Sequence, residues 1–286
     1  MEETLLHKLP DISEKKLSPE LIALDLDDTL LKNDLTISDY TVQTLQRAAD
    51  RGIYIVLCSG RTDNAILPYV RRLDIAGKPA GRYIVAQNGT SITDLHERRE
   101  IYAKLTDGDI LVEGYHEAQA MGLAVEVCDA STIYTPCVNS YVERDAALTN
   151  LRLEIISDFE SFLQKKFPKL IVSGDPAVIE RLEQRMRSVM GSRCVMARSK
   201  PFYLEIQSPG TGKGEALIWL ADYLHLDRKR IMAFGDSMND ETMMRNAGLS
   251  VAMKNGLAVI QEQARYVSAY TNDEDGVARF IDAYVL

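Results

Sequence analysis

The segment Ile22–Thr29, IALDLDDT, constrains the fold more than any other stretch, because an apolar run ends there in three carboxylates and a hydroxyl. An apolar run of this length bounded by polar residues is typical of a buried strand, which places Asp25, Asp27 and Asp28 at or just beyond its carboxyl end. Ligands of open α/β sheets bind at that end. Carboxylates crowded there repel each other by up to ~4 kcal/mol per close pair at an effective dielectric of about 20, so we expect a bound cation.

Beyond this strand, helix and strand patterns alternate, first near the amino terminus and again near the carboxyl terminus. Ser38 suits the N-cap of a helix, because its hydroxyl can accept a hydrogen bond from the first turn. The other core elements that the pattern predicts are a strand at Ile53–Leu57, a helix from about Thr62, a strand at Tyr83–Val85, a helix at Lys213–Leu224, a strand at Ile231–Phe234, a helix at Asn239–Asn246, a strand at Leu249–Ala252 and a last helix. Strands separated by helices imply right-handed crossovers and a parallel sheet that is covered on both faces.

The segment between these two halves has a different pattern, which predicts an inserted α+β domain. Its expected strands are Leu123–Val127, Leu170–Val172 and Arg193–Ala197, and its expected helices are Gly108–Met121 and Pro176–Met190. The expected fold class is therefore α/β, with a doubly wound, Rossmann-like parallel sheet as the core. We place this core at residues 1–86 and 208–286 and the insert at residues 87–207.

Composition narrows the classes of partner. The 286 residues include 42 acidic and 33 basic ones, and no Lys/Arg-rich run could neutralise a phosphate backbone, so we expect no nucleic-acid partner. No segment approaches ~18 consecutive apolar residues and the amino-terminal stretch lacks the apolar core of a signal peptide, which favours a cytoplasmic protein without a membrane partner. The cysteines and histidines are scattered without metal-site spacing, so we assign them no catalytic role. The pattern predicts no oligomeric state.

Two further segments supply groups suited to an anion. The strand IYIVL ends in CSGR, in which the Ser59 hydroxyl and the flexible backbone around Gly60 suit anionic oxygens. The segment SPGTGKGEAL places Lys213 among glycines at the start of a helix, where its ammonium and the positive end of the helix dipole act together. Both features favour a bound phosphate. A nucleotide-binding P-loop is not expected, because GTGKG lacks the GxxxxGK[ST] spacing.

The segment IMAFGDSMND adds Asp236 and Asp240, with Asn239 between them, to the end of another strand. A divalent cation would resolve the repulsion, and Mg²⁺ fits best because it prefers hard oxygen ligands and combines carboxylates with waters and substrate phosphate. Each fragment alone has a plain structural explanation: a helix cap for DDT, a loop for SG, a turn for GD. Four fragments in this order, each after an apolar strand, favour one shared site.

These motifs, DLDDT, SGR, the Lys of GTGKG and GDSMND, resemble the four signature motifs of the haloacid dehalogenase (HAD) superfamily of phosphohydrolases. The similarity is greatest to the Cof-type subfamily with a C2B (type IIB) cap inserted between the second and third motifs, and it extends to VAMKNG and DEDGVA near the carboxyl terminus. The resemblance implies a Mg²⁺-dependent phosphatase whose cap closes over the site and selects the leaving group. Two positions qualify it: Ser59 stands where Thr is usual, and Asp27 argues against dehalogenase chemistry, since true dehalogenases lack this second acid.

The resemblance also implies a role for each site residue. Asp25 is expected to be the nucleophile and Asp27 the general acid and base. The residues expected to contact phosphate are Ser59, Gly60, Lys213 and Asn239. The groups expected to bind Mg²⁺ are Asp25, Asp236 and the backbone carbonyl of Asp27, and Asp240 is expected to support both the metal and the lysine. Arg61 and Asn88 are candidates that face the substrate.

We therefore interpret the chain as a phosphoric monoester hydrolase that acts on small phosphorylated metabolites such as sugar phosphates through an aspartyl-phosphate intermediate. Two alternatives stay open. A phosphomutase or phosphotransferase would use the same Asp25 chemistry and return the phosphoryl group to a sugar hydroxyl. A non-catalytic regulator that binds a metabolite would not need Asp25 and Asp27. The physiological substrate is not predicted.

Overall fold

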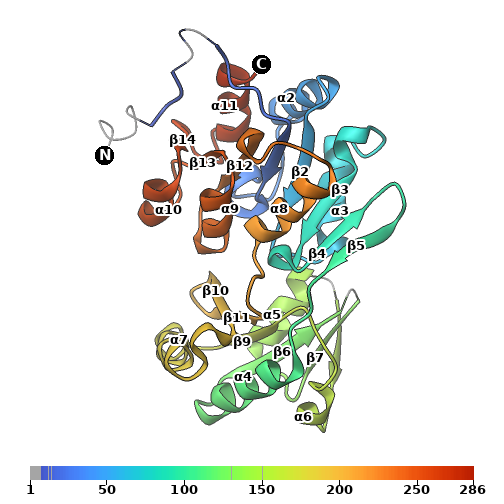
Figure 1. The fold of residues 1–286 in the computed structure, drawn as a ribbon. Coiled ribbons are helices and arrows are strands. Elements are labelled where there is room, and N and C mark those ends of the chain that lie inside the picture. Colours follow the sequence, from blue (N-terminus) through green and yellow to red (C-terminus); the bar gives the residue numbers. More distant parts are fainter. Residues whose placement is uncertain (1–7, 12, 14, 130, 150) are drawn as a thin grey trace. The chain divides into compact units, whose positions relative to one another are not determined.

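The computed structural model describes residues 8–286 except residues 12, 14, 130 and 150. These residues fold into two compact units (Figure 1). The first unit contains the chain up to Tyr102 together with Gly212–Leu286, and the second unit is Ala103–Thr211. The first unit is thus assembled from two parts of the chain that the second unit separates in sequence.

The first unit is built on an eight-stranded sheet with the order β14-β13-β12-β1-β2-β3-β4-β5. β1 lies near its centre, parallel to β12 on one side and to β2 on the other, and β4 pairs antiparallel with β3. The strands are β1 (Leu21–Leu24), β2 (Tyr54–Cys58), β3 (Tyr83–Ala86), β4 (Ser91–Asp94), β5 (Arg99–Ala103), β12 (Ile231–Gly235), β13 (Leu249–Ala252) and β14 (Tyr266–Val267). The largely parallel order confirms the predicted α/β class.

Helices cover both faces of this sheet, because alternate residues of its central strands point to opposite sides. In β1, Ile22 and Leu24 belong to one hydrophobic cluster, whereas Leu21 and Ala23 belong to another. The first cluster includes side chains of α2 (Asp39–Asp50), α3 (Asp63–Leu73) and α11 (Gly276–Tyr284). The second includes side chains of α8 (Lys213–Tyr223), α9 (Glu241–Asn246) and α10 (Ala258–Gln263). This is the doubly wound arrangement that the sequence predicts.

Short-range signals explain where several elements begin. Ser38 caps α2 as predicted, since its hydroxyl accepts a hydrogen bond of 3.1 Å from the backbone N–H of Thr41. The helix predicted at Asn239–Asn246 starts with a tight turn, after which α9 follows. The short helical turns of this unit are η1 (Leu26–Leu30), η2 (Pro79–Gly81), η3 (Gln87–Gly89), η5 (Arg228–Arg230) and η6 (Met238–Asp240).

The second unit has its own six-stranded sheet with the order β10-β11-β9-β6-β7-β8. Its strands are β6 (Ala124–Cys128), β7 (Thr132–Thr135), β8 (Arg152–Ile155), β9 (Leu170–Ser173), β10 (Val195–Lys200) and β11 (Tyr203–Gln207), and its helices and turns are α4 (Gly108–Ala120), α5 (Ser140–Thr149), α6 (Phe159–Phe162), α7 (Pro176–Met190) and η4 (Gly191–Arg193). One face packs on α4 and α7, with Leu170 and Val172 of β9 in that cluster. The other face carries a smaller cluster that includes Val142 of α5.

The start of the second unit differs from the predicted start of the insert. We expected the insert at residues 87–207, but β4 and β5 extend the sheet of the first unit, so the second unit runs from Ala103 to Thr211. Ile92 of β4 pairs with Val85 of β3 and joins the cluster beneath α8. The sequence pattern of a strand does not indicate which sheet the strand joins, because this depends on the strand with which it pairs.

Other strand bounds moved by a few residues: the strands predicted at Ile53–Leu57 and Arg193–Ala197 are Tyr54–Cys58 and Val195–Lys200. Among the helices formed by the described residues, none combines the length and the apolar character needed to cross a bilayer.

Candidate active site

The site residues predicted from the sequence meet at one edge of the eight-stranded sheet. β12, β1, β2 and β3 are neighbours and run parallel, so their carboxyl ends lie side by side. In this order, the segments after these four ends carry Asp236, Asp25, Ser59 and Asn88. The beginning of α8 brings Lys213 to the same edge.

Lys213 is completely buried, and its ammonium lies between two carboxylates. Its Nζ donates to Asp25 Oδ1 at 2.6 Å and to Asp240 Oδ1 at 2.7 Å. α8 can start here because Gly89 lies against the backbone of Gly212: a Cβ added at Gly89 would be only 2.1 Å from the Gly212 carbonyl oxygen. Gly89 also has a φ of +86°, which favours glycine. These two glycines therefore allow the close packing that brings the lysine to the acids.

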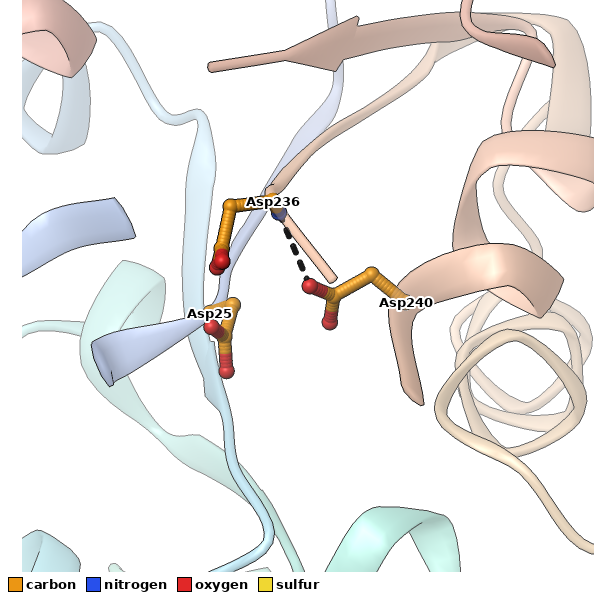
Figure 2. A group of neighbouring side chains, drawn as sticks. All are labelled: Asp25, Asp236 and Asp240. Atoms are coloured by element: carbon orange, nitrogen blue, oxygen red, sulfur yellow. Dashed lines mark hydrogen bonds between the residues drawn. The ribbon is translucent and has the colours of Figure 1, made fainter. Parts of the chain in front are cut away.

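Asp25, Asp236 and Asp240 form a group of buried carboxylates, one ligand atom of each lying within 4.8 Å of the others (Figure 2). Both oxygens of Asp240 are engaged, Oδ1 by Lys213 and Oδ2 by the backbone N–H of Asp236 at 2.9 Å. Oδ1 of Asp236 accepts a hydrogen bond of 3.0 Å from the buried hydroxyl of Thr29. Among the described residues, no donor contacts Asp25 Oδ2 or Asp236 Oδ2, so these two oxygens can take up a ligand.

The electrostatics of the group favour a cation. Burial raises the pKa of Asp25 well above its ordinary value; Asp240 adds to this effect and Lys213 opposes it. Burial and the Asp240 charge raise the pKa of Asp236 to about 7. Burial acts to lower the pKa of Lys213, but the two carboxylates outweigh it and raise that pKa above its ordinary value. The ammonium therefore stays charged, and the remaining negative charge is costly until a cation binds.

The donor set fits Mg²⁺, which prefers hard oxygen ligands and binds through one or two carboxylates plus water and phosphate. Since Asp240 is fully engaged, Asp25 and Asp236 are the carboxylates available to the metal, and Asp240 supports them. The side chain of Asp27 lies outside the group of three. Its expected contact through the backbone carbonyl stays a prediction.

Another set of contacts joins the loops after β2, β3 and β12. The backbone N–H of Asn88 donates to the carbonyl of Ser59 at 2.9 Å, and Asn239 Nδ2 donates to Asn88 Oδ1 at 3.1 Å. A Cβ at Gly60 would lie 3.1 Å from Asn88 Oδ1, so glycine permits this close approach. The structure thus brings Ser59, Gly60, Asn88 and Asn239 together, as the motifs predict, while their contacts with phosphate and substrate stay predictions.

Asp27 and Arg61 form a two-pronged ion pair. Arg61 Nε donates to Asp27 Oδ2 at 3.0 Å and Nη2 donates to Asp27 Oδ1 at 2.6 Å. The guanidinium also donates to the Tyr69 hydroxyl at 3.2 Å. Burial acts to lower the pKa of Arg61, but the Asp27 carboxylate outweighs it, so the net shift is upward. Arg61, expected to face the substrate, contacts the expected acid and base directly.

Sequence reasoning did not include Thr29, Asn255 or Asn272 among the site residues. Thr29 contacts Asp236, and the two asparagines line a surface pocket of about 310 Å³ that Asp236 also borders. The available signals were the Thr that ends DLDDT and the asparagines in VAMKNG and TNDEDG. The sequence around these residues does not indicate which residues they contact, because the contacts join positions more than two hundred residues apart.

The chain is similar to known proteins in both sequence and structure. Residues 22–281 match a family model described as haloacid dehalogenase-like hydrolase. The chain is 30% identical to 5-amino-6-(5-phospho-D-ribitylamino)uracil phosphatase YitU of Bacillus subtilis, over 93% of this chain and 97% of the relative. Its structure resembles a haloacid dehalogenase-like hydrolase from Bacteroides thetaiotaomicron with a TM-score of 0.80 and 29% identity, over 93% and 99% of the two chains. It shares the fold of the HAD subclass IIB sugar phosphatase BT4131, with a TM-score of 0.80 at 19% identity, over 93% and 98% of the chains.

Proposed function

Because the chain belongs to the haloacid dehalogenase-like hydrolases and is a phosphatase of that family, we propose that it hydrolyses small phosphorylated metabolites with Mg²⁺ as its cofactor. One observation carries the proposal. Asp25 lies at the centre of the sheet edge with Oδ1 held by Lys213 and Oδ2 without a donor among the described residues, next to a second available carboxylate on Asp236. A carboxylate placed in this way can act as a nucleophile toward phosphorus.

The proposed reaction has two in-line steps. First, a carboxylate oxygen of Asp25 attacks phosphorus, the bond between phosphorus and the ester oxygen breaks, and the leaving oxygen takes a proton from Asp27. Then water attacks the phosphorus of the aspartyl-phosphate, the bond between phosphorus and the Asp25 oxygen breaks, Asp27 takes a proton from that water, and inorganic phosphate leaves with Asp25 restored as a carboxylate. The metal, when bound, neutralises negative charge on the phosphoryl oxygens. Lys213 orients Asp25 and adds positive charge beside the transferring group.

We propose the substrate class from the name of a relative. The relative at 30% identity is named for a uracil derivative with a phosphorylated ribityl chain. We therefore propose phosphorylated sugars and polyols as the first compounds to test. The expected cytoplasmic location stays a prediction. The role of the second unit in selecting the leaving group also stays a prediction.

A phosphate-release screen tests this function. The wild-type chain is incubated with sugar phosphates, a polyol phosphate, an aryl phosphate and a nucleotide, with Mg²⁺ or with a chelator. We expect release of inorganic phosphate that depends on Mg²⁺ and a loss of at least ~10³-fold in kcat for Asp25→Asn, because the nucleophile is removed. Asp34→Asn is the matched control, since Asp34 is an exposed carboxylate whose hydrogen bonds within the described part of the chain go to the nearby Thr36. Unchanged turnover in Asp25→Asn would refute the mechanism, and isomerised product without phosphate release would indicate a mutase.

A further inference from the structure

The turn that follows the expected nucleophile is held by a side chain from the far end of the chain. Asp28 has a φ of +60°, and its backbone carbonyl accepts a hydrogen bond of 2.7 Å from Nδ2 of Asn255. A residue with a side chain rarely adopts this left-handed conformation, so a contact that fixes its peptide group restricts the whole turn. Asp28 directly follows Asp27 and precedes Thr29, which bonds to Asp236.

The side-chain amide of Asn255 is used at both ends, which defines its orientation. Its Oδ1 accepts a hydrogen bond of 3.0 Å from the backbone N–H of Asn272. Asn272 is buried, and its own Nδ2 donates to the carbonyl of Leu31 at 2.9 Å. The two asparagines therefore hold both ends of the turn from Asp28 to Leu31.

The loop that carries Asn255 is also fixed to the segment that carries Asp236. The backbone N–H of Leu257 donates to the carbonyl of Asp236 at 2.8 Å, and the backbone N–H of Met253 donates to the carbonyl of Gly235 at 3.0 Å. Asn255 thus connects the loop of Asp25 with the loop of Asp236. These loops carry the two carboxylates that are available to a metal.

We propose that Asn255 is a positioning residue for the cation site, which acts by keeping the loops of Asp25 and Asp236 at the spacing that Mg²⁺ requires. The inference rests on the proposed function, because it assumes that these two carboxylates bind the metal. Mg²⁺ demands nearly ideal geometry, so a small change in loop spacing lowers its affinity. Asn255 itself is exposed, so its substitution leaves the core clusters untouched.

The experiment compares Mg²⁺ binding by calorimetry in the full-length wild type, Asn255→Ala and Asn255→Asp. The first variant loses both hydrogen bonds. The second keeps the size of the side chain but cannot donate to the Asp28 carbonyl, and its added negative charge alone would strengthen cation binding. We expect both to bind Mg²⁺ about 10-fold or more weakly, with kcat lowered at subsaturating Mg²⁺ and KM for the phosphate ester within about 2-fold.

Gln261→Ala is the matched control, because the side-chain hydrogen bonds that Gln261 Nε2 makes with described residues go to the carbonyls of Met253 and Lys254 in the same loop. We expect this variant to bind Mg²⁺ within about 2-fold of the wild type. Wild-type affinity in both Asn255 variants, or an equal loss in Gln261→Ala, would overturn the proposal. A wild type that binds Mg²⁺ but releases no phosphate would refute the proposed reaction and leave this comparison valid, whereas a wild type that binds no Mg²⁺ would overturn both.

Discussion

At the scale of single residues, Asp27 has two requirements to meet. The structure holds its carboxylate against Arg61 through two hydrogen bonds of 2.6 and 3.0 Å, so both of its oxygens accept from the guanidinium. The proposed chemistry asks the same residue to give a proton to the leaving oxygen. Arg61 therefore contacts the same two oxygens that the proposed proton transfer would use.

Asp27→Asn tests the proton-donating role. Asn has no acidic proton to give, so esters with poor leaving groups should be affected most. We expect kcat/KM for an alkyl phosphate to fall by ~10² to 10⁴-fold and that for an activated aryl phosphate to fall by less than about 10-fold. The parameter kcat/KM is the right one because it excludes the later hydrolysis of the aspartyl-phosphate. Equal losses for both esters would show that Asp27 does not protonate the leaving group.

At the scale of elements, the sheet of the second unit carries acids on a buried face. The register pairs Ile171 of β9 with Glu126 of β6 and with Glu205 of β11, so these side chains share one face. Lys169, two residues before Ile171, forms an ion pair of 2.9 Å with Glu205. Burial, with a smaller contribution from Asp145, raises the pKa of Glu126 to about 10. Glu126 is therefore neutral at pH 7.

This raised pKa predicts a stability that depends on pH. Unfolded Glu126 titrates at its ordinary value, so its contribution to stability is fully present below about pH 4.5 and is lost as the pH rises toward about 10. Glu126→Gln has nearly the same shape and cannot ionise. We expect this variant to be more stable than the wild type by an amount on the order of 1 to 3 kcal/mol at about pH 8, and equally stable at about pH 4.

Urea unfolding followed at both pH values measures this difference. Glu154→Gln on β8 is the control, because all residues of that strand are exposed and the substitution should leave stability unchanged at either pH. An equal gain for Glu126→Gln at both pH values would contradict the assignment of a buried, titrating carboxyl.

At the scale of the whole molecule, the two units have separate interiors. The clusters of the second unit contain only residues between Ile110 and Ile206, and those of the first unit contain none of them. The ends of the second unit also lie close together, since Lys104 Nζ donates to the carbonyl of Gly210 at 3.0 Å. A unit with its own core and adjacent ends has the properties of an independent domain.

We therefore expect residues 103–211 to fold when produced alone. Circular dichroism should show helix and strand content with one cooperative thermal transition. The fragment 87–207, which follows the boundary predicted from the sequence, is the comparison. It carries β4 and β5 without β3, the pairing partner of β4, and should aggregate or melt without cooperativity. A cooperative transition in 87–207 but not in 103–211 would show that the boundary is at the earlier position.

The sequence predicted most of the core elements, because their signals are local. Pro176 begins α7 and Ser38 caps α2 at the predicted residues, since capping and proline preferences act within one turn. β11 and α5 were not predicted: Tyr203–Gln207 is a short strand, and only Val142 of α5 is buried. The periodicity of such short elements is weak, so the packing around them decides whether they form a helix or a strand.

The chemistry of the site could likewise be predicted from the sequence, but not every contact between its side chains could. Carboxylates, a lysine and glycines after apolar strands indicate an edge that binds a cation and a phosphate, because the side-chain types and their place in each strand are written in the local pattern. The resemblance implied that Asp240 supports Lys213, and the structure shows this contact. The pairing of Arg61 with Asp27 was not predicted, because it depends on how close two loops come after folding.

The amino-acid order alone thus determined the class of fold, the strands that carry the acids and the kind of ligand that they suit, since each of these follows from neighbours along the chain. Tertiary structure decided that β4 and β5 extend the sheet of the first unit, that Glu126 is buried beside other acids, and that Asn255 reaches Asp28 from 227 residues away. The physical reason is the same in each case: hydrogen bonding and burial depend on which surfaces meet after folding, and local preferences do not specify those meetings.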